Sequence, residues 1–168
     1  FDYMKAIAKI QGNNWFLGIG EYGAVNFNPD RLVHMGIYGK SGYGKSTFVK
    51  AIIGQTLNRR PDIDHIMIDP KGTELSVFKN HPNVIKTAVS KDEIDSVILC
   101  LLIEMGVREY YVKNSFENPP TGLLEYRELR KTHKAKLPDF KPIIIWVDEA
   151  HVYFDTNTSA STREKAFE

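Results

Sequence analysis

Short apolar runs of strand length alternate along this chain with longer segments in which apolar residues recur at helical spacing. The apolar runs predict strands over residues 32–38, 63–69, 84–89 and 143–147, and the helical spacing predicts helices over residues 47–57 and 94–105. Strands that alternate with helices form parallel sheets, because each crossover packs back against the sheet. The pattern therefore predicts a three-layer α/β domain with a mainly parallel sheet and ligands at the carboxyl ends of its strands.

The second of these helices has the clearest start and the clearest apolar face. Ser90 and Glu93 have the spacing of a capping box ahead of the apolar positions. Arg108, Glu109 and Lys113 are expected to extend the helix toward solvent. One face is expected to pack into the core, and its residues are Ile94, Val97, Ile98, Leu101, Leu102 and Met105.

Two further regions complete the expected elements. β-forming residues on both sides of Gly20-Glu21-Tyr22-Gly23 predict an N-terminal β-hairpin over residues 15–27. Residues 118–122, Asn-Pro-Pro-Thr-Gly, interrupt the chain before a charged segment, residues 123–132, that predicts a short helix. Because the chain shows no internal repeat and no clear linker, we expect residues 1–168 to form a single domain.

Composition narrows the class of protein only slightly. The chain has 168 residues, is 42% hydrophobic and 26% charged, and carries a net charge of +1. These values are ordinary for a globular domain, and the balanced charge gives no support for a nucleic-acid partner. The longest mainly apolar stretch, residues 97–103, is far shorter than the about 20 residues needed to cross a bilayer.

One cysteine, Cys100, lies inside that stretch, so no disulfide can form within the chain. We therefore expect a reduced, cytoplasmic setting, and we expect Cys100 itself to be a small buried apolar residue. The chain opens at Phe1 without an initiator methionine and ends at Glu168 in a polar stretch. We expect it to be a fragment of a larger protein, in which other segments could provide a membrane tether.

Residues 39–46 fit the phosphate-loop pattern GxxxxGK[ST] and stand between the first predicted strand and the first predicted helix. Glycines let the backbone turn tightly with its N–H groups pointing inward, and the following helix offers its positive N-terminus to phosphate. Lys45 would reach the β- and γ-phosphates of a nucleoside triphosphate, and Ser46 would hold Mg²⁺. The predicted nucleotide-binding residues are Gly39, Lys40, Ser41, Gly42, Tyr43, Gly44, Lys45, Ser46 and Thr47.

An acidic pair, Asp148 and Glu149, directly follows the last apolar run, Ile-Ile-Ile-Trp-Val. Asp148 would bind Mg²⁺ through its water shell, and Glu149 would polarise the attacking water as a general base. Alone, the pair fits the acidic N-terminus of a helix equally well. Together with the phosphate loop it predicts an ATPase, in which Lys45 and Mg²⁺ neutralise the charge of the transferred phosphoryl group.

Three segments of the chain resemble the FtsK/SpoIIIE family of DNA translocases, which are RecA-like ring ATPases. They are residues 34–46 with the phosphate loop, residues 68–77 with Ile-Asp-Pro-Lys and Glu-Leu-Ser, and residues 143–149 with the acidic pair. The resemblance covers roughly residues 16–152. It implies a RecA-like P-loop fold, an additional strand between those that carry Lys45 and Asp148, and six subunits in a ring around double-stranded DNA.

The chain departs from that family at Tyr43, at Gly72-Thr73 and at Ala150-His151, which suggests a divergent branch such as a conjugation or secretion motor. We therefore expect a motor that uses ATP to move double-stranded DNA, in chromosome partitioning or conjugative transfer. The ATPase of a protein secretion system and a non-catalytic ring-assembly module are the alternatives. An ABC-type ATPase would need an LSGGQ-like signature, and residues 120–140 contain none.

Several basic residues allow two interpretations each. Lys71 would contact nucleotide or a neighbouring subunit, or it is simply a solvated lysine in a turn. A further set would either touch the phosphates of DNA or form solvated faces, and its members are Arg59, Arg60, Arg127, Arg130, Lys131 and Lys134.

Overall fold

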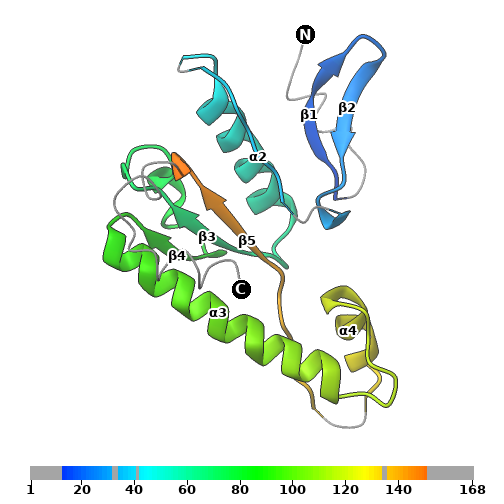
Figure 1. The fold of residues 1–168 in the computed structure, drawn as a ribbon. Helices are drawn as coiled ribbons and strands as arrows, with labels where there is room; N and C mark the ends of the chain where they lie inside the picture. The colour runs from blue at the N-terminus through cyan, green and yellow to red at the C-terminus, as the bar shows by residue number, and fades with distance from the viewer. Residues whose placement is uncertain (1–12, 32–33, 41, 134–135, 151–168) are drawn as a thin grey trace. The chain divides into compact units, whose positions relative to one another are not determined.

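The structure, a computed structural model, describes residues 13–31, 34–40, 42–133 and 136–150. The chain divides into two compact units, residues 1–61 and 62–168, and each is described by itself (Figure 1). Whether the two units form the single domain expected from the sequence stays a prediction. The elements in chain order are β1 (Trp15–Gly20), β2 (Gly23–Phe27), η1 (Pro29–Arg31), α2 (Lys45–Arg59), β3 (Asp64–Ile68), η2 (Ser76–Phe78), β4 (Val84–Ala88), α3 (Lys91–Asn114), α4 (Leu123–Arg130) and β5 (Ile143–Val147).

The first unit consists of the β1–β2 hairpin and helix α2. The two strands pair in antiparallel fashion from Trp15 opposite Phe27 to Gly20 opposite Gly23, which confirms the predicted hairpin and its turn. Helix α2 packs against β1. Apolar side chains from both elements are buried, namely Trp15, Phe16, Ile52, Ile53 and Leu57.

The strand predicted over residues 32–38 is not seen in its described part. Residues 34–40 form no strand, and the side chains of Met35 and Tyr38 are exposed. A run of apolar residues forms a strand only where a neighbouring strand pairs with its backbone groups. No described strand pairs with residues 34–38, so this apolar run does not form a strand among the described residues.

The second unit is built on a parallel three-stranded sheet in which β3 lies between β4 and β5 (Figure 1). The chain passes from β3 to β4 through a turn and the short helix η2, and from β4 to β5 through helices α3 and α4. The predicted α/β class, with a mainly parallel sheet and an N-terminal hairpin, is therefore confirmed.

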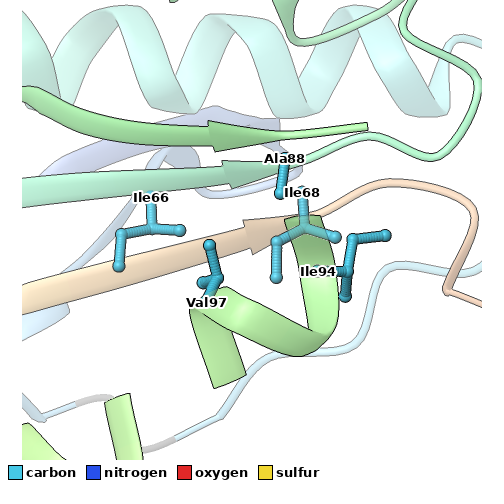
Figure 2. Close-up of a cluster of buried hydrophobic side chains, with 5 residues drawn as sticks. All are labelled: Ile66, Ile68, Ala88, Ile94 and Val97. Atoms are coloured by element: carbon cyan, nitrogen blue, oxygen red, sulfur yellow. The ribbon is translucent and has the colours of Figure 1, made fainter. Parts of the chain in front are cut away.

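The core of the second unit lies between the sheet and the start of α3. Figure 2 shows Ile66 and Ile68 of β3 and Ala88 of β4 beside Ile94 and Val97 of α3. The two isoleucines stand two positions apart and so share one face of their strand, while the two helical residues stand three apart and share one face of the helix. Burying each large apolar side chain contributes roughly 1.5 to 3 kcal/mol, so this cluster fixes the helix on the sheet.

Helix α3 begins where its capping box predicts. The Ser90 hydroxyl accepts from the Glu93 N–H, and the Glu93 carboxylate accepts from the Ser90 N–H at 2.9 Å. The predicted core face is wrong beyond the first turns, since Leu102 and Met105 are 49% and 63% exposed. Arg108, expected in solvent, instead donates to the Glu104 carboxylate and the backbone oxygen of Lys141.

The exposure of α3 follows from its length. It has 24 residues, whereas each strand of the sheet has 5. The helix is therefore roughly 36 Å long beside strands of roughly 17 Å, and its second half runs past the sheet (Figure 1). Cys100, expected to be buried, is likewise exposed and carries a free thiol. No helix within the described ranges is long and apolar enough to cross a bilayer.

Three of the arginines that were candidates for DNA contact form ion pairs with carboxylates, whereas Arg59 donates to the backbone oxygen of Asn14 at 3.2 Å. Arg60 is only 5% exposed, and its guanidinium lies 2.8 Å from the Asp30 carboxylate. Arg130 donates to Asp139 at 3.1 Å, and Arg127 lies 3.6 Å from the same carboxylate. A paired, buried guanidinium is costly to release, because its carboxylate would be left without a partner. Arg60 therefore links the end of α2 to η1, and Asp139 links Arg127 and Arg130 of α4 to the segment that follows the helix.

Candidate active site

The phosphate loop leads directly into the first turn of α2. Gly42 and Gly44 have left-handed backbone angles, with φ of 83° and 84°, which glycine adopts readily and other residues rarely adopt. Gly44 is the N-cap of the helix, and no side chain caps it. The helix starts at Lys45, so the pattern of glycine turn and helix start has the form that the sequence predicts.

The start of α2 leaves backbone donors open. The first N–H groups of a helix have no acceptor inside the helix. Among the described residues, none of the N–H groups of residues 44–47 donates to a group outside the helix. Together with the positive end of the helix dipole, such N–H groups bind anions, and phosphate in particular. Lys45 and Ser46 lie half-buried in this turn, while Tyr43 in the loop is largely exposed.

The acidic pair lies at the carboxyl end of the three-stranded sheet. Val147 pairs with Ile68, and the Asp148 N–H continues the ladder by donating to the backbone oxygen of Ile68 at 3.0 Å. Asp148 is buried, with 7% of its surface exposed. Its carboxylate is therefore fixed to a rigid element, as a residue that orients a metal ion through water must be.

Glu149 has an unusual backbone. Its φ is 49°, the one left-handed angle at a residue other than glycine within the described ranges. This conformation costs an ordinary residue roughly 1 kcal/mol, so the surrounding structure must hold it. The Glu149 carboxylate lies 3.1 Å from the Lys71 ammonium. Neither interpretation offered for Lys71 included this ion pair.

The turn that carries Lys71 is tied together by one buried carboxylate. Asp69 Oδ1 accepts from the Gly72 N–H at 2.9 Å, and Asp69 Oδ2 accepts from the N–H groups of Glu74 and Leu75 at 2.8 and 2.9 Å. Asp69 is buried and directly follows β3. Residues 68–77, one of the three segments that resemble the FtsK/SpoIIIE family, therefore contain a turn capped by the Asp69 carboxylate, and Lys71 of this turn contacts Glu149 of the acidic pair.

The metal assignment stays a prediction. Among the described residues, no three histidine, cysteine or acidic side chains gather into a metal-binding group. Mg²⁺ nevertheless needs only one or two protein oxygens, because waters and substrate phosphates complete its shell. The Ser46 hydroxyl and the Asp148 carboxylate suit that chemistry.

The structure brings Asp148, Glu149, Asp69 and Lys71 together in the second unit. Lys45 and the rest of the phosphate loop belong to the first unit, so the assembly of both halves into one site stays a prediction. Three residues considered from the sequence, Ser41, Lys134 and His151, lie outside the described residues.

Comparison with known proteins agrees with these features. The FtsK DNA translocase of Streptococcus pyogenes serotype M3 (strain SSI-1) is 32% identical over 130 residues, and that of Bacillus cereus (strain ATCC 14579) is 30% identical over 133 residues. Each match covers 75% of this chain and 16% of the relative, so the chain spans about one sixth of the length of these proteins.

A solved structure supports the same fold. The conjugation coupling protein TcpA of pCW3, in its monomer form with ATPγS, is similar with a TM-score of 0.71 and 21% sequence identity. The likeness covers 98% of this chain and 43% of that protein, which confirms the P-loop α/β fold. The family model described as the central domain of helicase HerA matches residues 22–108, more than half of the chain. The chain therefore belongs to the HerA/FtsK family, as its phosphate loop, Ile-Asp-Pro-Lys turn and acidic pair imply.

Proposed function

We propose that this chain is the ATP-hydrolysing part of a motor that moves double-stranded DNA. The observation that carries the proposal is the start of α2. It is supported by two left-handed glycines, by Lys45 at the first helical position, and by the N–H groups of residues 44–47, which donate to no described group outside the helix. Such a helix start suits a polyphosphate. The resemblance to FtsK translocases and the match to the HerA family give that site an ATPase context.

The acidic pair supplies the residues for hydrolysis. Glu149 would accept a proton from water as the water oxygen forms its bond to the γ-phosphorus and ADP leaves with the electrons of the broken P–O bond. Lys45 would neutralise charge on the β- and γ-phosphates. Mg²⁺, which Ser46 and Asp148 would hold, supplies further neutralisation when bound. The rigid position of Asp148 at the end of β5 supports this division of roles.

The cargo is proposed from the relatives. Those named above are DNA translocases and a conjugation coupling protein, which favours DNA over polypeptide as the transported polymer. A ring of six subunits and a cytoplasmic position of this part of the protein belong to the same proposal. The balanced net charge of +1 means that DNA contact would depend on local groups rather than on the overall charge.

The catalytic assignment is tested with two variants of the full-length protein. Lys45→Ala should abolish tight ATP binding, because the phosphates lose their main positive partner. Glu149→Gln should bind ATP with unchanged affinity and lose at least about a hundredfold in hydrolysis rate, as expected for removal of a general base. Binding is measured with a fluorescent ATP analogue and hydrolysis by phosphate release. Glu128→Gln, a neutralised carboxylate on the exposed side of α4, is the matched control and should behave as wild type.

The assignments would be wrong if Glu149→Gln hydrolysed ATP at the rate of the Glu128→Gln control. The cargo is tested separately by measuring the ATPase rate with duplex DNA, with an unfolded polypeptide, and with neither. Stimulation by duplex DNA supports a DNA translocase. Stimulation by the polypeptide alone would assign the motor to protein secretion instead.

A further inference from the structure

We propose that Lys71 is a positioning residue for Glu149, which it holds at the end of β5 in the orientation that accepts a proton from the attacking water. The proposal rests on the proposed ATPase function, since it concerns the residue assigned as the general base. Lys71 itself would contact neither the nucleotide nor the water. Its ammonium acts through the Glu149 carboxylate, from which it lies 3.1 Å.

The parallel pairing of β3 and β5 brings the two residues together. Ile68 pairs with Val147 at the end of the ladder, and the Asp148 N–H still bonds to the Ile68 oxygen. The chain leaves both strands at the same level of the sheet, because parallel strands end on the same side. Lys71 stands three residues after Ile68, and Glu149 stands two residues after Val147, so each side chain has only a short distance to cross.

Lys71 is presented by a turn with little freedom. The Asp69 carboxylate, two residues before Lys71, accepts hydrogen bonds from three backbone N–H groups in the residues that follow Lys71. Gly72 has φ of 68°, and a Cβ at this position would lie 3.2 Å from the side chain of Val89, the residue that follows β4. The turn is thus clamped both by hydrogen bonds and by packing, and the base of the Lys71 side chain is fixed.

The backbone conformation of Glu149 also restricts the direction of its side chain. A left-handed angle directs its side chain differently from that of a residue continuing the strand, and the ion pair gives the carboxylate a partner in that direction. The side chains of Lys71 and Glu149 are 50% and 25% exposed, so the pair contributes little to folding stability. Because the Lys71–Glu149 ion pair adds little stability and Lys71 is held by a rigid turn, we assign the pair to orienting the Glu149 carboxylate rather than to stabilising the fold.

The test compares Lys71→Ala, Lys71→Arg and Lys91→Ala in the full-length protein. Lys91 is a matched control, because its side chain is also 50% exposed and forms an ion pair, at 2.7 Å with Asp95, far along the chain from Glu149. We expect Lys71→Ala to lower kcat about tenfold with KM for ATP within about twofold of wild type, as for loss of a residue that orients a catalytic group. Lys71→Arg should restore most of kcat, and Lys91→Ala should match wild type.

A double variant separates positioning from other roles. In the Glu149→Gln background, Lys71→Ala should cause no further loss of rate, because the carboxylate that it orients is already absent. The proposal is overturned if Lys71→Ala resembles Lys91→Ala, if it raises kcat, or if it mainly raises KM, which would indicate direct contact with nucleotide. If instead Glu149→Gln itself keeps the wild-type rate, the proposed base is wrong and the failure lies with the proposed function.

Discussion

The side-chain amide of Gln55 pairs with both backbone polar groups of Phe16. Gln55 Oε1 accepts from the Phe16 N–H at 2.8 Å, and Gln55 Nε2 donates to the Phe16 oxygen at 3.1 Å. The register of the β1–β2 pairing shifts directly after Phe16. Gln55 of α2 therefore provides hydrogen-bond partners for the Phe16 backbone at the point where the strand pairing is irregular. The helix that follows the phosphate loop and the hairpin are thereby joined by buried polar contacts as well as by apolar packing.

Replacing Gln55 by leucine should destabilise the first unit by about 2 to 4 kcal/mol. The buried N–H and oxygen of Phe16 lose their partners, while leucine keeps a side chain of similar volume. The free energy of unfolding is measured by urea titration. Asn58→Ala is the control on the same helix, since the Asn58 amide donates to the Gly54 oxygen on an exposed surface. Equal losses in the two variants would contradict the importance assigned to the Gln55–Phe16 contact.

Replacing Asp69 by alanine should cost about 3 kcal/mol or more, because three N–H groups lose one shared acceptor and the Leu75 N–H is buried. Asp69→Asn should fall between alanine and wild type, since it keeps one acceptor oxygen. Asp95→Ala, which removes a carboxylate from an exposed ion pair on α3, should cost less than about 1 kcal/mol. A loss for Asp69→Ala as small as that of Asp95→Ala, measured by thermal unfolding, would show that the turn does not depend on this carboxylate.

His65 makes the stability of the second unit sensitive to acid. Its ring is buried, and Nδ1 accepts from the Trp146 Nε1–H at 2.9 Å, which requires the neutral form. Burial first, and then the neighbouring His81, lowers the pKa of His65 from 6.5 to about 4, against a smaller raising effect of Asp64. Between pH 6.5 and about pH 4, His65 is therefore largely protonated in the unfolded chain and largely neutral in the folded chain.

The stabilising contribution of neutral His65 should therefore be complete above about pH 6.5 and should be lost progressively as the pH falls toward 4. Urea titrations at a series of pH values measure this dependence. His65→Asn, which keeps an acceptor for Trp146 but does not titrate, should show a shallower fall in stability over the same range. A wild-type slope in His65→Asn would show that His65 is not the cause of the pH dependence.

The features predicted correctly from the sequence are those with a local physical cause. The capping box of Ser90 and Glu93 fixes the start of α3, and the glycines at positions 20 and 23 fix the turn of the hairpin. The glycines before Lys45 likewise set the loop and the start of α2. In each case the residues that determine the geometry are neighbours in the chain.

The features that were missed depend on partners far away in the sequence. Residues 34–38, the described part of the strand predicted over 32–38, belong to an apolar run of strand length, yet no described strand pairs with them. Leu102 has the spacing of a core residue, yet the strands are too short to cover it. The Lys71–Glu149 pair requires the register of β3 and β5, which no local pattern encodes. The sequence Asp-Pro-Lys-Gly at positions 69–72 does indicate the turn that carries Lys71, because an aspartate at the start of such a turn often accepts hydrogen bonds from the backbone that follows. It does not indicate the partner of Lys71.

Cys100 lies exposed on α3 and is the single cysteine of the sequence. An accessible thiol that occurs once gives the chain a unique attachment point, so a maleimide dye or spin label can be coupled there without removing other cysteines. Such a probe would report on the surface of α3 when nucleotide or polymer is added. The same thiol can also join two copies of the chain by air oxidation, so a reductant belongs in every measurement of assembly state.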